Sequence, residues 1–163
     1  MLIGTYHIWR TILWNMKKNT ISLITGAILT LLFIIFSTPL FESLFYSREF
    51  SNEMYAANLY LVVAIVTAVV AWGLSGIYYY VINSVSFSRW YHWLIMLCVA
   101  VVIVPLITYA YADHVFADDG LDFSGQLSAF CIINLAVEAV LFIIASYSMR
   151  WWSSNCRHTP IPE

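Results

Sequence analysis

Residues 54–88 read MYAANLYLVVAIVTAVVAWGLSGIYYYVINSVSFS and contain no charged side chain. Glu53 and Arg89 flank this stretch, which exceeds the roughly 20 apolar residues that a helix needs to cross the hydrocarbon of a bilayer. A water-soluble helix normally alternates apolar and polar faces, and this stretch does not. It therefore predicts a transmembrane helix.

Three other segments repeat the pattern. Residues 19–41 and 90–112 also lack charge, and residues 123–149 carry a single charged side chain, Glu138. The sequence thus predicts an all-α membrane protein that folds as a four-transmembrane-helix bundle. We expect one membrane domain over residues 19–152, with spans at about residues 20–41, 56–82, 90–111 and 126–149, and a polar tail over residues 153–163.

The overall composition agrees with this reading and excludes other classes. Of the 163 residues, 62% are hydrophobic and 10% are charged, so a water-soluble domain of this length would have no place to bury its apolar surface. The net charge is −2, and the longest basic run is the pair Lys17-Lys18. These two features of charge disfavour nucleic acid as a partner, and the surplus of apolar residues favours the lipid bilayer.

The basic residues predict the orientation, because cytoplasmic loops of membrane proteins are enriched in lysine and arginine. In the four-span arrangement only Arg48 falls on one side, and the other basic residues share the opposite side: Arg10, Lys17, Lys18, Arg89, Arg150 and Arg157. We therefore expect a multi-pass protein of the inner (plasma) membrane with both termini in the cytoplasm.

The first 18 residues form a separate pattern. Apolar side chains recur at alternating steps of four and three, at Leu2, Tyr6, Trp9, Leu13 and Met16. Such spacing is typical of an amphipathic helix lying in the membrane interface, which is our expectation for residues 1–18. Packing beneath the bundle and an irregular or partner-bound segment are the alternatives.

Glu138 is the residue whose surroundings matter most, since a charged side chain at mid-bilayer costs about 3 kcal/mol even on mild scales. Asn134 lies one turn earlier on the same expected helix, and Thr30 and Thr67 lie at similar depth on other spans. Because Cys131, Asn134 and Glu138 share one helix face, that face should point into the bundle or towards a neighbouring subunit. Glu138 is then a structural hydrogen-bonding acid, an inter-subunit contact or an ion-handling group.

Small residues recur on two of the expected spans. Ser22, Gly26 and Thr30 lie four apart on the first, and the second has a row at spacings of four, three and four: Ala64, Ala68, Ala71 and Ser75. Small side chains let helix backbones approach closely in lipid, where helix association depends on packing. These rows predict tight helix contacts.

No pattern in the sequence indicates catalysis, a cofactor or a metal. The acidic loop of residues 112–122 offers four carboxylates and His114, but it lacks the alternating ligands and closing glutamate of a calcium loop, and cation binding there is the lesser alternative. Cys98, Cys131 and Cys156 show no metal-ligand spacing. We therefore expect a protein that is not an enzyme, with no cofactor.

The expected cytoplasmic end is rich in aromatic and basic side chains that can meet a partner: Arg89, Trp90, Trp151, Trp152, Arg157 and His158. The tail is polar and contains Pro160 and Pro162, so it is either disordered or extended against another protein.

By elimination, the sequence predicts a non-enzymatic subunit that anchors or completes a multiprotein envelope assembly of the secretion or injection type, with itself as a possible further partner in a homo-oligomer. The alternatives are an immunity-type membrane protein that captures a basic toxin at its acidic outer loops, and a small cation channel or transporter that uses Glu138.

Overall fold

The computed structural model describes residues 2–161, with side chains described from Asn19 onward, and this part of the chain is mainly helical. The α-helices are α1 (Leu2–Ile35), α2 (Ser37–Leu44), α3 (Arg48–Ala56), α4 (Leu59–Gly76), α5 (Trp90–Asp118) and α6 (Ser124–Met149). A π-helical turn, η1 (Ile77–Ile82), extends α4, and two 3-10 turns follow at η2 (Val85–Phe87) and η3 (Arg150–Trp152).

Three stretches are long and apolar enough to cross a membrane, namely Leu59–Ile82, Trp90–Asp118 and Ser124–Trp152. A fourth crossing exists if the bent pair Asn19–Ile35 and Ser37–Leu44 counts as one span. The helices confirm the all-α class that the sequence predicts, and three or four of them are long and apolar enough for a membrane protein.

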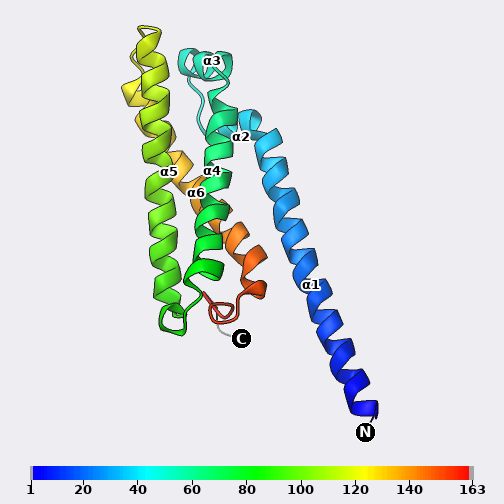
Figure 1. Ribbon diagram of the computed structural model, residues 1–163. Coiled ribbons are helices and arrows are strands. Elements are labelled where there is room, and N and C mark those ends of the chain that lie inside the picture. Colours follow the sequence, from blue (N-terminus) through cyan, green and yellow to red (C-terminus); the bar gives the residue numbers. More distant parts are fainter. Residues whose placement is uncertain (1, 162–163) are drawn as a thin grey trace.

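The first expected span, residues 20–41, is not one straight helix. The chain bends by 72° between α1 and α2. Pro39 explains the position of the bend, because proline has no N–H to donate to the carbonyl four residues earlier, at Ile35, and its ring crowds that carbonyl. α1 therefore ends there, and α2 leads from the end of α1 to α4 (Figure 1).

The segments expected to be loops are largely helical. α3 occupies most of the connection between α2 and α4, and Asn58 follows it with a φ of 55° that reverses the chain. α5 continues to Asp118 through the first half of the expected acidic loop, and Gly120, with a φ of 72°, makes the turn into α6. We call this end of the molecule, residues 45–58 and 112–123, the acidic end.

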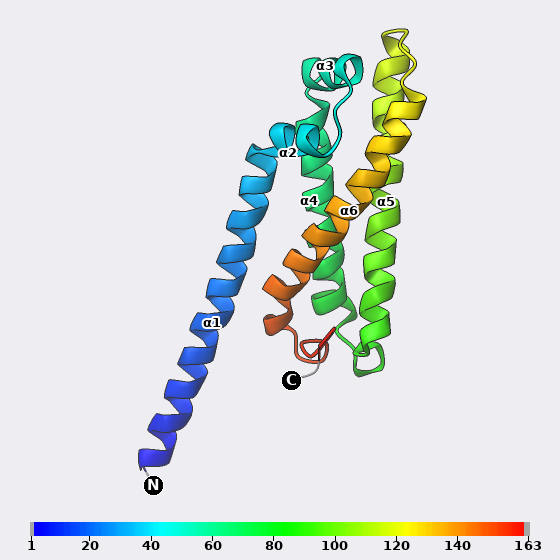
Figure 2. The same cartoon turned by 180° about the vertical axis from the view of Figure 1, so that it is seen from behind.

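α4 and α6 form the centre of the bundle, with α5 on one side and α1 on the other (Figure 1). Seen from behind, α6 crosses the bundle diagonally and approaches α1 at the end opposite to α2 (Figure 2). We call that opposite end, residues 77–90 and 150–161, the basic end. The backbone of residues 2–18 continues α1 as a helix, but their side chains lie outside the described residues, so the expected interfacial role of residues 1–18 stays a prediction.

The buried apolar side chains form two groups, one towards each end. At the acidic end, Phe41 packs between Tyr60 and Phe130 with ring centroids 6.1 and 5.1 Å away, and Phe50 lies 5.9 Å from Phe130. At the basic end, Tyr78, Tyr79, Trp93 and Phe142 are the large members. The aromatic packing of α2 and α3 against α4 and α6 closes the acidic end of the bundle.

Candidate functional site: a buried polar row and the basic end

Glu138 is completely buried on α6. Cys131 and Asn134 are buried on the same face of α6. Of the two orientations expected for this face, towards the bundle interior or towards a neighbouring subunit, the structure has the first. Within the described residues neither Oε1 nor Oε2 of Glu138 has a hydrogen-bond partner. Proteins normally give a buried polar group a hydrogen-bond partner, and this carboxyl group has none among the described residues. Because the carboxyl group lies inside one chain, it does not face a neighbouring subunit.

Asn134, one turn away, is hydrogen-bonded to side chains from two other helices. Its Nδ2 donates to Thr108 Oγ1 at 3.1 Å, and its Oδ1 accepts from Thr67 Oγ1 at 3.3 Å. The Thr67 hydroxyl also lies 2.8 Å from the Val63 carbonyl oxygen. This buried cluster ties α4, α5 and α6 together, so each bond helps to fix the helix register.

Thr30 belongs to a different contact. On α1, its hydroxyl donates to the Gly26 carbonyl at 2.9 Å and accepts from Trp72 Nε1 of α4 at 2.9 Å. The structure thus brings Thr67 and Asn134 together and places Thr30 in a separate α1–α4 contact. The sequence indicated that Thr30, Thr67 and Asn134 lie at similar depth, but depth alone does not show which neighbouring helix each side chain faces.

A further polar contact lies closer to the basic end. Ser146 of α6 is buried, lies 3.3 Å from the Ser75 hydroxyl of α4, and accepts from Trp93 Nε1 of α5 at 3.0 Å. Sequence reasoning missed Ser146, Trp93 and Thr108. For Thr108 the available signal was spacing, because Ala100, Val104, Thr108 and Ala112 recur every four residues and are all buried on α5.

The rows of small residues lie at helix contacts. Ala64, Ala68, Ala71 and Ser75 are all buried on α4. On α1, Ser22 Oγ donates to the Tyr147 carbonyl at 3.5 Å, and Gly26 lies so close to Ser148 that a Cβ added at Gly26 would come 2.7 Å from the Ser148 Cβ. α1 thus meets α6 closely at one point, where only a glycine fits.

The tail folds back under the bundle at the basic end. The Tyr78 hydroxyl donates to Phe87 O at 3.0 Å and is 3.2 Å from Thr159 Oγ1, and the Tyr79 hydroxyl donates to Thr159 O at 3.1 Å. Thr159 is buried, and the bond that follows it, to Pro160, is cis. The expectation of a disordered or partner-bound tail gives way to a tail that packs on its own chain.

Asn83 organises this fold. It has a φ of 27°, which turns the chain after η1. Its Oδ1 accepts from Ser153 Oγ at 2.7 Å and from the Asn155 backbone N–H at 3.0 Å, and its Nδ2 donates to Ser154 Oγ at 2.9 Å. One side chain therefore holds three successive residues of the tail.

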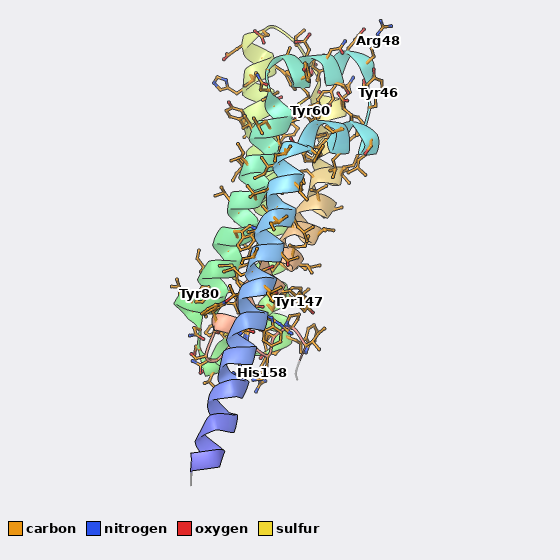
Figure 3. All side chains as sticks on the ribbon, turned by 90° about the vertical axis from the view of Figure 1, so that its right-hand side faces the viewer. Tyr46, Arg48, Tyr60, Tyr80, Tyr147 and His158 are labelled. Carbon is orange, nitrogen blue, oxygen red and sulfur yellow. The ribbon has the colours of Figure 1, made fainter. Side chains whose placement is uncertain are left out.

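The residues expected to dock a partner lie around this folded tail. Trp90 and Trp152 are 60% and 46% exposed, Arg89, Arg157 and His158 are also exposed, and Trp151 is half-buried. Arg157 Nε donates to His158 Nε2 at 3.0 Å, and Arg150 lies over the Trp151 ring at 4.1 Å from its centroid. Figure 3 shows His158 and Tyr147 at this end, away from Arg48 and Tyr46.

Cys156 offers a direct measure of tail docking. Its thiol is fully buried, 3.7 Å from the Ser84 carbonyl oxygen, and burial raises the pKa of the thiol above its ordinary value. We expect a water-soluble maleimide to label Cys156 about tenfold more slowly in the wild type than in Asn83→Ala, because only the thiolate of an exposed tail reacts. Peptide mass spectrometry identifies the labelled cysteine.

The pH dependence follows from the same shift. The docked tail favours the neutral thiol, so the contribution of Cys156 to docking is complete below the ordinary thiol pKa and declines as the pH rises past it.

For the maleimide experiment, Asn52→Ala, on the exposed surface of α3, is the matched control and should label like the wild type. Equal labelling of Asn83→Ala and the wild type would contradict the docked tail.

The acidic end is solvated. Asp113, Asp118, Asp119 and Asp122 are exposed, and His114 Nδ1 lies 3.1 Å from Asp118 Oδ2. The Asp122 carboxylate accepts from the Ser124 N–H at 3.1 Å, which lowers the pKa of that carboxyl group. Among the residues that the structure describes, no group of three or more His, Cys, Asp or Glu side chains is placed to hold a metal ion.

Comparison with protein-family models, with curated proteins and with solved structures finds no match to this sequence.

Proposed function

We propose that this chain is a non-enzymatic integral membrane subunit that anchors or completes a multiprotein envelope assembly, and that it meets its partner at the basic end. The membrane is the inner (plasma) membrane, and the basic end faces the cytoplasm in agreement with the distribution of lysine and arginine. The bundle supplies the anchor, and the folded tail supplies the docking face.

The ordered tail is the observation that carries this proposal. Tyr78, Tyr79 and Asn83 hold it against the bundle through the hydrogen bonds described above. The backbone that carries Arg157 and His158, and follows Trp152, is therefore ordered before any partner arrives. Tryptophan and arginine are the side chains that most often dominate binding energy at protein interfaces. A preorganised face also loses less conformational entropy on binding.

Site-specific photo-crosslinking in cells tests the proposal. A benzoylphenylalanine at Trp152 should yield discrete crosslinked protein bands, whereas the same probe at Tyr55, which is 67% exposed at the acidic end, should not. The Asn83→Ala variant, which releases the tail, should reduce the Trp152 crosslink about tenfold, equivalent to roughly 1.4 kcal/mol of binding free energy.

Inserted protein that gives no crosslink from Trp152, or gives equal crosslinks from Trp152 and Tyr55, would reject docking at the basic end. Membrane insertion of each variant is checked by its resistance to alkaline extraction. A crosslink from Tyr55 alone would favour the immunity-type alternative instead.

The exposed carboxylates of the acidic end are the observation in favour of that second function. Asp113, Asp118, Asp119 and Asp122 are exposed and could attract a basic toxin domain, and complementary charge of this kind accelerates association. The channel alternative receives less support, because Glu138 is buried within one chain and a pore shared between copies needs that carboxylate on the surface.

A further inference from the structure

The basic end carries positive charge with no negative charge beside it in the sequence. Its residues include three arginines, Arg89, Arg150 and Arg157, but no aspartate or glutamate. Arg89 and Arg157 are exposed, and within residues 19–161 the structure pairs neither of them with a carboxylate. A surface of one charge sign complements a partner of the opposite sign. The charges of the basic end therefore fit an acidic partner.

Two residues of the tail lie where an approaching partner meets them first. Cys156 and Thr159 are buried against the bundle, whereas Arg157 and His158, which lie between them in the chain, are exposed. Arg157 and His158 therefore project away from the bundle, from a tail that lies beyond the end of α6 (Figure 1). Figure 3 likewise places His158 at this end of the molecule. Lipid headgroups surround the circumference of a bundle, so a surface across its end favours a partner from the aqueous phase.

The guanidinium group of Arg157 is already oriented for a ligand. Its Nε donates to His158 Nε2 at 3.0 Å, and among the described residues this is the one hydrogen bond that the group makes. The edge formed by Nη1 and Nη2 stays open. Two parallel N–H groups match the two oxygens of a carboxylate, and such paired, charge-assisted bonds are among the stronger ones in proteins. Because His158 holds the group, less side-chain entropy is lost when a carboxylate binds.

We infer that Arg157 is the recognition residue of the basic end and that it binds a carboxylate side chain on an acidic segment of a cytoplasmic protein. His158 is a positioning residue, which acts through Arg157. The exposed rings of Trp90 and Trp152 offer apolar contact area that a protein segment can use and a small anion cannot. The inference rests on the proposed function for the place of docking and adds the chemistry of the partner.

Binding of a fluorescent octaglutamate peptide to the full-length protein tests this chemistry. The protein is held in nanodiscs of phosphatidylcholine, which has no net charge, and binding is followed by fluorescence anisotropy. Arg157→Gln should weaken binding about tenfold, the effect of losing one charge-assisted contact. Arg48→Gln makes the same change at an exposed arginine of the acidic end, and this matched control should bind like the wild type. Arg157→Lys and His158→Ala keep the charge of the side chain at 157 and should fall between the two.

Two results of the peptide measurement would overturn the inference. Equal binding by the wild type and Arg157→Gln would show that Arg157 is not the recognition residue. Full binding by Arg157→Lys would show that the fork of N–H groups is not used. Labelling of Cys156 at the wild-type rate establishes that the tail of each variant is still docked, so a loss of binding reports on the side chain that was changed.

The photo-crosslink from Trp152 in cells separates this inference from the proposed function. The crosslink to protein should fall about tenfold in Arg157→Glu and stay unchanged in Arg48→Glu. A crosslink that persists in Arg157→Glu overturns the acidic segment and leaves docking at the basic end in place. If the wild type gives no crosslink, the proposed function fails, and the peptide measurement still decides the role of Arg157. Adducts of the Trp152 probe with phospholipid in place of protein overturn the acidic segment in favour of anionic headgroups.

Discussion

Gly26→Leu is expected to detach α1 from α6 and to lower the free energy of unfolding by about 3 kcal/mol, at the upper end of the cost of overpacking. Even a methyl group at Gly26 would overlap the Ser148 hydroxyl, which donates to the Ile144 carbonyl at 2.7 Å. The Ser148 Cβ lies 2.7 Å from the added Cβ, so rotation of the hydroxyl cannot relieve the overlap. Unfolding by SDS in mixed micelles, followed by circular dichroism, measures the loss.

Gly73→Leu is the matched control, because a Cβ at Gly73 meets no atom within 4 Å. It makes the same chemical change on α4 and should alter the unfolding free energy by less than about 1 kcal/mol.

A second experiment tests the coupling between Gly26 and Ser148 with smaller substitutions. Ser148→Gly should recover most of the stability lost in Gly26→Ala, since it removes the atoms that overlap. Additive losses in the double variant would show that the α1–α6 contact is not at Gly26.

Glu138→Leu is expected to stabilise the bundle by about 1 to 3 kcal/mol, the range measured for burying an unpartnered polar group. The carboxyl group is fully buried without a hydrogen-bond partner among the described residues, and leucine has a comparable size. Replacement removes the unpartnered polar atoms and leaves no cavity. Glu138→Gln keeps a buried polar group and should not give this gain. The same SDS titration provides the measurement.

Asn134→Leu is expected to have the opposite sign. It lies one turn from Glu138 and is equally buried, but its amide bonds to Thr67 and Thr108. Leucine would leave the Thr108 hydroxyl unpaired and should destabilise the bundle by about 1 to 3 kcal/mol. Destabilisation by Glu138→Leu of the same size as by Asn134→Leu would mean that the Glu138 carboxyl group has a partner in the membrane.

The membrane-embedded helices were predictable because charged side chains are excluded from hydrocarbon, so the distances between charges mark the spans. Glu53 and Arg89 flank one of the stretches that the structure finds apolar enough to cross, and a second begins directly after Arg89 and runs past Asp113 to Asp118. The 72° bend was not anticipated, although Pro39 supplied the signal. α3 and the end of α5 were missed because their charged residues resemble those of a solvated loop.

Of the candidate site, the sequence predicted which residues are polar and buried but not which of them meet. Helical spacing correctly placed Cys131, Asn134 and Glu138 on one face. It could not show that Thr30 faces Trp72, because that depends on the rotation of α1 about its own axis. The docking of the tail depends on the positive φ of Asn83 and on contacts some 70 residues apart in the chain, and no local pattern encodes either.

The length of α5 sets a limit on the membranes that suit this protein. Residues 90–112 span about 34 Å at 1.5 Å per residue, a little more than the roughly 30 Å of hydrocarbon in an ordinary bilayer. In a slightly thicker bilayer, α5 can match the hydrocarbon thickness by tilting less from the membrane normal. If the hydrocarbon is thicker than about 34 Å, Asp113 in the next turn of α5 would lie within it, at a high cost in free energy. We therefore expect the protein to favour bilayers of ordinary or lesser thickness.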